Sequence, residues 1–202
     1  MSKLPTTLSA LLLVAGFSGC ATTSQNSPET TPDKVLARID GLTERPNWFS
    51  ESEAFVIRNG EVASLGSSTI PGDQRIEAAI RIAENNAKAG LCKVLEQRLE
   101  FVFQNAEEGA SVDATQARFI GSEACKLTTS SMRPGRIYWE KVATTSERGE
   151  RLARYRVFAT ITMPEAEFKQ AILDTARKQS QGPQFTRAFE KTVNAQWERL
   201  SQ

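Results

Sequence analysis

Three cysteines, Cys20, Cys92 and Cys125, are the side chains of this sequence that are best suited to covalent chemistry. The chain of 202 residues contains no histidine, which excludes Ser-His-Asp and Cys-His catalysis and zinc sites with histidine ligands. The CxxC spacing typical of thiol–disulfide exchange is absent as well. Carboxylates are plentiful, but the sequence places no pair of them as general acid and base. We therefore expect a protein that is not an enzyme, with no catalytic residue, no metal and no cofactor.

Cys20 follows a segment with the pattern of a secretory signal peptide. Residues 1–19 contain Lys3, a short apolar stretch and then small residues, and the stretch is too short to span a bilayer as a helix. Phe17-Ser18-Gly19-Cys20 resembles the lipobox of bacterial lipoproteins, which are cut before the cysteine and carry a diacylglyceryl group on its thiol. The resemblance implies that Cys20 is lipidated and that Ala21 permits export to the outer membrane. The alternative is an ordinary secreted protein in which Cys20 is incidental.

The residues after Cys20 have the composition of a linker. Residues 21–33 are rich in Thr, Ser and Pro and have no aliphatic side chain larger than alanine. Such a segment buries too little apolar area to offset the entropy lost on ordering it. Residues 35–39 add only a short, weak apolar segment. We therefore predict that the lipidated cysteine and a flexible tether occupy residues 20–44.

The charge of the chain is balanced. The sequence has 25 Lys and Arg against 24 Asp and Glu, a formal net charge of +1. Proteins that bind a phosphate backbone carry an excess of basic side chains, so we expect no nucleic-acid partner.

Periodicity and turn residues predict a mixed fold. Asn59-Gly60 between apolar runs is typical of a β-hairpin, and apolar residues at spacings of three and four from Ile76 to about Gln104 predict a long helix. Further elements are expected in this order: a second helix over 112–129, a second hairpin with strands at 137–143 and 152–163, and helices after Pro164 and Pro183. The order predicts an α+β domain in which an antiparallel sheet of two hairpins packs on the long helix, with additional C-terminal helices.

Cys92 and Cys125 each lie on one of the predicted helices, 33 residues apart. In an oxidising periplasm they could form a disulfide, and the alternative is two buried thiols on facing helices. The sequence leaves both open.

Two groups of aromatic residues are candidates for contacts with partners. Trp48 and Phe49 follow a proline and could anchor a partner or close one end of the core. Near the C-terminus an apolar stripe has a strict spacing of four, with Phe185, Phe189, Val193 and Trp197. This stripe could pack on its own domain, or it could mediate self-association or bind a partner helix.

Over residues 45–175 the chain resembles the LPP-twenty lipoproteins, a family of small surface antigens with relatives among flagellar outer-membrane lipoproteins. The matching pieces, besides the lipobox, are Pro46-Asn47-Trp48-Phe49, the strand from Gly60 to Gly66, the alanine-rich helix from Ala78 to Leu95 and the later pair of strands. We therefore expect an LPP-twenty-like domain at 45–180, and an amphipathic helix at 181–202 that extends past the family pattern.

The resemblance implies a non-enzymatic envelope lipoprotein that works through protein contacts in surface or flagellar assemblies. The sequence thus predicts a protein anchored to the outer membrane, with envelope or flagellar partners or further copies of itself. A tethered module that binds peptidoglycan, a synthase or a small ligand is the alternative.

Overall fold

The computed structural model describes residues 33–50, 54–105, 112–146, 149–179 and 182–201. The predicted signal peptide, the lipidated Cys20 and the first part of the predicted tether lie outside the described residues.

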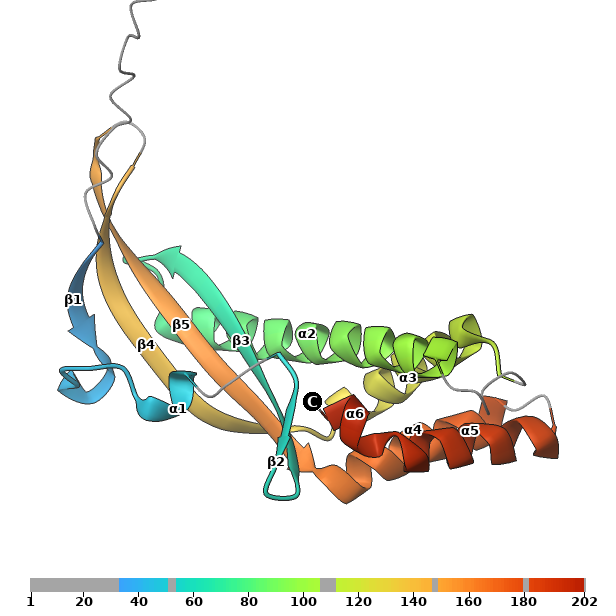
Figure 1. The fold of residues 1–202 in the computed structure, drawn as a ribbon. Helices are drawn as coiled ribbons and strands as arrows, with labels where there is room; N and C mark the ends of the chain where they lie inside the picture. Colours follow the sequence, from blue (N-terminus) through green and yellow to red (C-terminus); the bar gives the residue numbers. More distant parts are fainter. Residues whose placement is uncertain (1–32, 51–53, 106–111, 147–148, 180–181, 202) are drawn as a thin grey trace, which may run out of the picture. The chain divides into compact units, whose positions relative to one another are not determined.

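A five-stranded antiparallel sheet with the order β1-β4-β5-β3-β2 forms one side of the fold (Figure 1). The strands are β1 (Lys34–Arg38), β2 (Val56–Arg58), β3 (Glu61–Pro71), β4 (Arg133–Thr145) and β5 (Arg151–Pro164). The pairs β2–β3 and β4–β5 are the two predicted hairpins, and β3 joins them by pairing with β5 along its whole length. The α+β prediction is thereby confirmed, including the two hairpins.

The first strand corrects the predicted extent of the tether. Residues 34–44 are not a linker, because β1 pairs with β4, with Lys34 opposite Ala143 and Arg38 opposite Glu140. A short 3-10 helix, η1 (Ile39–Gly41), follows. An edge strand is held mainly by backbone hydrogen bonds, which need no strong apolar pattern, so the weak apolar segment gave little sign of it.

The long helix α2 (Ile76–Asn105) covers one face of the sheet with its first half and packs on other helices with its second. Its fully buried residues recur every four positions, at Ala79, Ala83, Ala87, Leu91, Leu95 and Leu99. A step of four residues turns about 40° beyond a full turn, so the buried line winds around the helix. Because of this winding, α2 contacts the sheet through its alanines and the other helices through its leucines.

Small residues bring β3 unusually close to α2. The hydroxyl groups of Ser64 and Ser68 donate hydrogen bonds to the carbonyl oxygens of Ala87 (2.8 Å) and Ala79 (2.7 Å). Gly66 lies between them, where a Cβ atom would be 2.0 Å from the carbonyl oxygen of Ala83. The contact therefore depends on a glycine.

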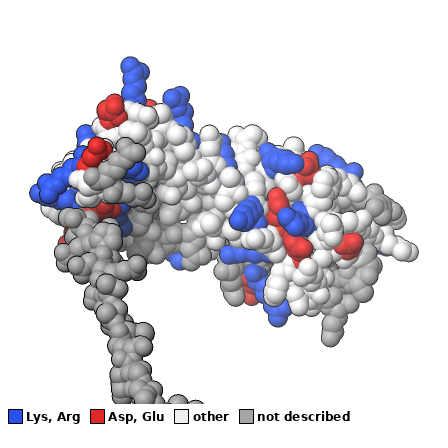
Figure 2. Space-filling model, turned by 90° about the horizontal axis from the view of Figure 1, so that it is seen from above, with Lys and Arg blue, Asp and Glu red and all other residues white. Residues whose placement is uncertain are grey.

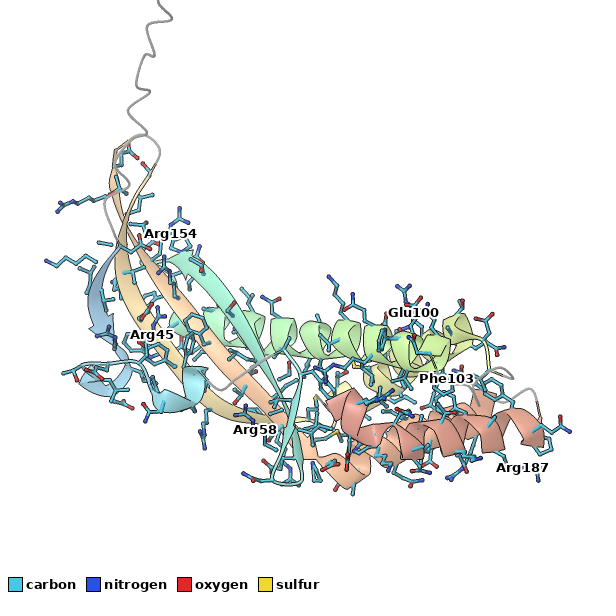
Figure 3. All side chains as sticks on the ribbon, in the orientation of Figure 1. Arg45, Arg58, Glu100, Phe103, Arg154 and Arg187 are labelled. Carbon is cyan, nitrogen blue, oxygen red and sulfur yellow. A yellow bond between two sulfur atoms is a disulfide. The ribbon has the colours of Figure 1, made fainter. Side chains whose placement is uncertain are left out.

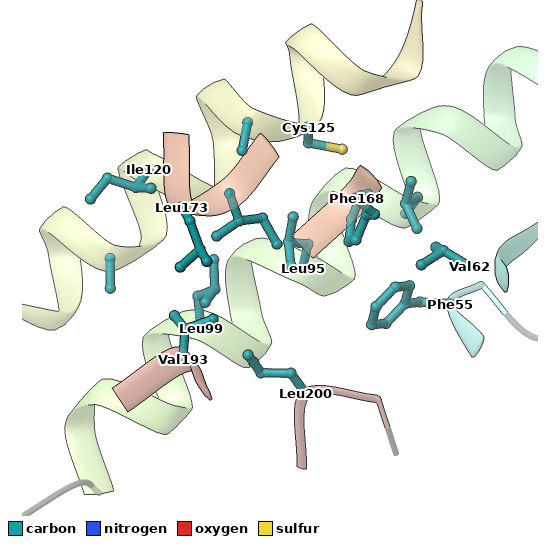
Figure 4. Close-up of a cluster of buried hydrophobic side chains, with 14 of the residues drawn as sticks. Phe55, Val62, Leu95, Leu99, Ile120, Cys125, Phe168, Leu173, Val193 and Leu200 are labelled. Atoms are coloured by element: carbon teal, nitrogen blue, oxygen red, sulfur yellow. The ribbon is translucent and has the colours of Figure 1, made fainter. Parts of the chain in front are cut away.

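The remaining helices build the larger core around the second half of α2. They are α3 (Ala114–Thr129), α4 (Glu165–Gln179), α5 (Pro183–Ala195) and α6 (Trp197–Ser201). The short helix α1 (Asn47–Ser50) precedes the first hairpin and contributes no described residue to this core. Figure 4 shows the buried side chains that meet there, among them Leu95, Leu99, Ile120, Phe168, Val193 and Leu200. Within the described part of the chain, no helix has both the length and the apolar character of a membrane span.

The C-terminal residues belong to this core, which corrects two of the predicted partner contacts. Phe189 is fully buried and its ring stacks on Phe103 with the centroids 4.9 Å apart. Trp197 is 8% exposed, and its indole nitrogen donates a 2.6 Å hydrogen bond to Glu165. Phe189 and Trp197 are therefore not available to a partner, and 181–202 is not a separate helix. The half-buried Phe185 packs against the same cluster.

The residues of the C-terminal apolar stripe belong to two helices rather than one. α5 ends at Ala195, and the chain breaks at Gln196 before α6 starts. The break turns Trp197 and Leu200 back onto the core, where Leu200 is fully buried.

A disulfide joins α2 to α3. Cys92 and Cys125 are bonded, with their Cα atoms 5.4 Å apart. The structure thus has the bridged form of the two that the sequence left open.

Acidic and basic side chains are interspersed on the face of the molecule that Figure 2 shows. Arg118 on α3, for example, lies 3.7 Å from both Glu96 and Glu100 on α2. Such exposed pairs add little stability individually.

Gly66→Ala should lower the free energy of unfolding by about 3 kcal/mol, because its Cβ atom would overlap the backbone of α2. Gly90→Ala is the matched control: a Cβ there meets only Ala54, at 3.9 Å, and alanine favours the helix by roughly 0.5–1 kcal/mol. Urea denaturation measures both. Equal effects of the two substitutions would contradict the close contact between β3 and α2.

Replacing both Cys92 and Cys125 by alanine should lower the free energy of unfolding by about 3 kcal/mol, since the bridge closes a loop of 33 residues in the unfolded chain. Reductant should destabilise the wild-type protein similarly and leave the double variant unchanged. Alkylation of the unreduced, denatured protein followed by mass spectrometry gives the direct check. Labelling of both thiols would show that no bridge is present.

Candidate functional site

The face of the sheet opposite α2 buries a carboxylate. Alternate residues of β4 point to this face, so Tyr138 and Glu140 lie there beside their β5 neighbours Phe158 and Arg156. The side chain of Glu140 is 1% exposed. A carboxylate removed from water to this extent needs charged partners.

Arg45 is the main partner of Glu140. Its guanidinium donates two hydrogen bonds, from Nη2 to Oε1 (2.6 Å) and from Nε to Oε2 (3.2 Å). Figure 3 labels Arg45 beside β4, close to α1. Paired bonds of this kind fix both the distance and the orientation of the two groups.

Three further side chains complete the cluster around the carboxylate. The hydroxyl group of Tyr138 donates a 3.0 Å hydrogen bond to Oε2 and accepts a 3.1 Å bond from Nε of Arg38. Nη1 of Arg156 lies 4.0 Å from Oε1, and Arg156 also pairs with Asp33. Glu140 thus connects β1, β4, β5 and the segment before α1.

The electrostatics of this cluster keep the carboxylate ionised. Burial raises the pKa of Glu140, but the hydrogen bonds from Arg45 and Tyr138, and the charges of Arg45 and Arg156, outweigh burial and hold this pKa below its usual value. Burial, followed by the hydrogen bond to Glu140, raises the pKa of Tyr138. Neither group is thereby suited to exchange protons near neutral pH. The cluster is an ionic contact that holds the N-terminal segment on the sheet.

Phe49 adds an apolar contact to this ionic one. Its ring meets Phe158 edge to face with the centroids 4.5 Å apart and lies 6.0 Å from Tyr138. The guanidinium of Arg45 lies 5.1 Å from the centre of the Phe49 ring. Of the two roles that the sequence allowed for Phe49, the structure thus favours packing on its own domain over anchoring a partner.

The half-buried Trp48 borders a cleft instead. The cleft has a volume of about 380 Å³ and opens on the same face of the sheet as Glu140. Trp48 lines it together with Val56, Arg58, Asn59, Glu61, Ala63, Gly135, Arg136, Thr160 and Thr162. Figure 3 labels Arg58 near β2.

A bulge in β4 shapes this cleft. The register of β4 against β5 shifts between Pro134 and Ile137. Within the bulge, the amide of Arg136 donates a 2.7 Å hydrogen bond to the hydroxyl group of Thr160. A Cβ atom at Gly135 would lie 2.5 Å from that hydroxyl oxygen. The close approach needs glycine, and both Gly135 and the neighbouring Arg136 line the cleft.

Sequence reasoning missed both the ionic cluster and the cleft. One signal was present: Glu140 occupies a position between Tyr138 and Val142 on the same face of a strand, where an apolar residue is expected. Nothing in the sequence indicates that Arg45 lies beside Glu140, or that Arg136 lies in one cleft with Trp48.

The predicted site residues are distributed over the molecule rather than brought together. Trp48 borders the cleft and Cys92 and Cys125 form the bridge, while Phe185 and Phe189 belong to the helical layer. In the described ranges, no group of three or more His, Cys, Asp and Glu side chains is placed to hold a metal ion.

Comparisons of the chain with protein-family models, with curated proteins and with solved structures find no match. Membership of the LPP-twenty family therefore stays a prediction.

Glu140→Gln should lower the free energy of unfolding by about 2 kcal/mol, because the amide NH₂ would face a guanidinium that also donates. Since folding lowers the pKa of Glu140, its stabilisation is complete above the ordinary glutamate pKa of about 4.3 and is lost as the pH falls through the lower folded value. Unfolding of wild type and variant from pH 7 to pH 3 measures this, and the variant should show the shallower acid dependence.

The exposed Glu44→Gln, in the same segment, is the matched control and should change neither stability nor its acid dependence. Trypsin should also cut after Lys34 and Arg38 faster in Glu140→Gln than in the control. Equal cutting of the two variants would contradict the role of Glu140 in holding this segment.

Proposed function

We propose that this protein is a lipoprotein of the outer membrane, held there by acyl chains on Cys20, with a non-catalytic structural or assembly role in the cell envelope. The observation that carries the proposal is the lipobox-like Phe17-Ser18-Gly19-Cys20 directly after an apolar stretch. Flagellum-associated assemblies are one setting for this role, through the resemblance to the LPP-twenty family.

The position of the first described residues fits an anchored domain. Asp33 stands thirteen positions after Cys20, and β1 begins at the next residue. Thirteen residues span at most about 45 Å when fully extended. The folded part of a chain attached in this way therefore begins within about 45 Å of the lipidated residue.

The chemistry of the described residues supports a role in binding rather than catalysis. The sequence has no histidine, and the buried Glu140 is held as an ion by Arg45. Among the described residues that line the cleft beside Trp48, Glu61 is the one carboxylate, so these residues offer no pair for general acid and base catalysis.

The same cleft favours a second candidate, a tethered binding module for a small ligand or for peptidoglycan. Its volume of about 380 Å³ lies at the lower end of the range found for small-molecule sites, which is roughly 300–1,000 Å³. Its lining combines an indole with cationic and hydroxyl side chains.

Cys20→Ser should release the protein from the membrane fraction without changing its melting temperature, because the anchor is a lipid on a residue that precedes the folded domain. Fractionation after a high-salt wash, together with labelling by radioactive palmitate, measures the change. Ser27→Ala, beyond the lipobox, is the matched control and should stay labelled and membrane-bound.

Crosslinking in intact cells adds a second readout of the same two variants. A defined envelope protein, or a second copy of the chain, should crosslink to Ser27→Ala and be lost with Cys20→Ser. Sedimentation of Cys20→Ser with membranes after the salt wash, in the processed form that lacks residues 1–19, would overturn the lipid anchor.

A further inference from the structure

We infer that the cleft beside Trp48 binds a sugar ring that carries a carboxylate. The inference deepens the binding-module form of the proposed function and names the class of ligand for that site.

The charges in the cleft favour an anion. Arg58 from β2 and Arg136 from the bulge of β4 are both exposed and both line the cleft, while Glu61 is the one acidic side chain among the lining residues. Among the described residues that line the cleft, the cationic excess is therefore one charge. A guanidinium offers paired donors that match the two oxygens of a carboxylate.

The indole of Trp48 favours a ligand with a flat, CH-rich face. Trp48 is half-buried at the border of the cleft, and its ring meets Phe49 edge to face with the centroids 6.3 Å apart. Phe49 is in turn packed on Phe158, so the aromatic wall rests on the sheet. A rigid aromatic surface binds apolar area with little loss of side-chain entropy.

Neutral polar groups are available for the hydroxyl groups of a sugar. Thr162 and Asn59 line the cleft from β5 and from the turn of the β2–β3 hairpin. Ala63, with its small side chain, also lines the cleft. A compact anion such as phosphate would use the guanidinium groups but would leave the indole and these groups without contacts.

The ligand would add to contacts that already exist. Trp48 and Arg58 each have an interaction within the chain, and the amide of Arg136 is bonded to Thr160. Such contacts favour a preformed site, because less side-chain freedom is lost on binding.

Two acetylated sugars that differ by one carboxylate test the inference. N-acetylmuramic acid carries a lactyl carboxylate that N-acetylglucosamine lacks, and each can be titrated into the mature lipidated protein in detergent by calorimetry or by chemical-shift mapping. We expect the acid to bind at least 10-fold more tightly, since a charge-assisted hydrogen bond contributes about 1.5–3 kcal/mol.

Variants of the lining residues test recognition of the carboxylate and recognition of the sugar ring separately. Arg58→Gln and Arg136→Gln should each reduce affinity for the acid about 10-fold and leave the neutral sugar unchanged, whereas Trp48→Ala should weaken both sugars. Arg154→Gln is the matched control, because Arg154 is exposed on the same face of the sheet but outside the cleft. Circular dichroism and melting temperature verify that each variant is folded.

Three results would overturn the inference. Equal affinity for the two sugars would exclude the carboxylate, and displacement of the acid by inorganic phosphate at the same concentration would indicate a general anion site. If neither sugar binds, the cleft is excluded as a sugar site. None of these results affects the lipid anchor, which fractionation and palmitate labelling of Cys20→Ser test separately.

Discussion

The ion pair between Glu140 and Arg45 is the contact on which the second face of the sheet depends. A carboxylate that is 1% exposed is strongly destabilising without a partner. The folded state is therefore favoured only when the segment that carries Arg45 lies on β4, 95 residues away in sequence. Once Arg45 is there, Phe49 packs on Phe158, and Trp48 is set at the border of the cleft. A buried charge thus specifies the position of a segment whose own apolar content is too small to do so.

The two faces of the sheet are covered by different physical means. Toward α2 the sheet presents Gly66 and two serines, and the helix presents alanines, so the backbones approach closely and the contact is one of shape. Toward the N-terminal segment it presents Tyr138, Glu140 and Phe158, and the contact combines charge with aromatic packing. The first kind of contact involves no titratable side chain, whereas the second weakens as Glu140 becomes protonated. Acid should therefore loosen the N-terminal segment before it affects the packing of α2.

The sequence predicted those parts of the fold that are encoded locally. The long helix followed from the spacing of its apolar residues, and the first hairpin from Asn59-Gly60, where both residues adopt positive φ angles. Strand β1 was missed because backbone pairing at an edge leaves no apolar signature, and Glu140 because a buried charge is recognised only with its distant partner. The C-terminal stripe was open to two interpretations, since a helix that packs on its own core and one that binds a partner have the same spacing. The structure favours packing on its own core, where Trp197 donates a hydrogen bond to Glu165 of α4. The spacing of the stripe carries no information about that contact.

The cleft could not be predicted from the sequence for a related reason. Trp48, Arg58 and Arg136 come from α1, from β2 and from the bulge of β4, and only the antiparallel order of the sheet brings these segments to one place. The three side chains are at most half-buried and lie outside both hydrophobic clusters, so packing of the core does not explain why they converge. Phe49 and Gly135, by contrast, hold the cleft in shape by packing on Phe158 and by approaching Thr160. Substitutions at the first set should therefore change what the cleft binds without unfolding the domain, and substitutions at the second should change whether the cleft forms. This separation makes the function of the cleft accessible to mutation independently of the stability of the fold.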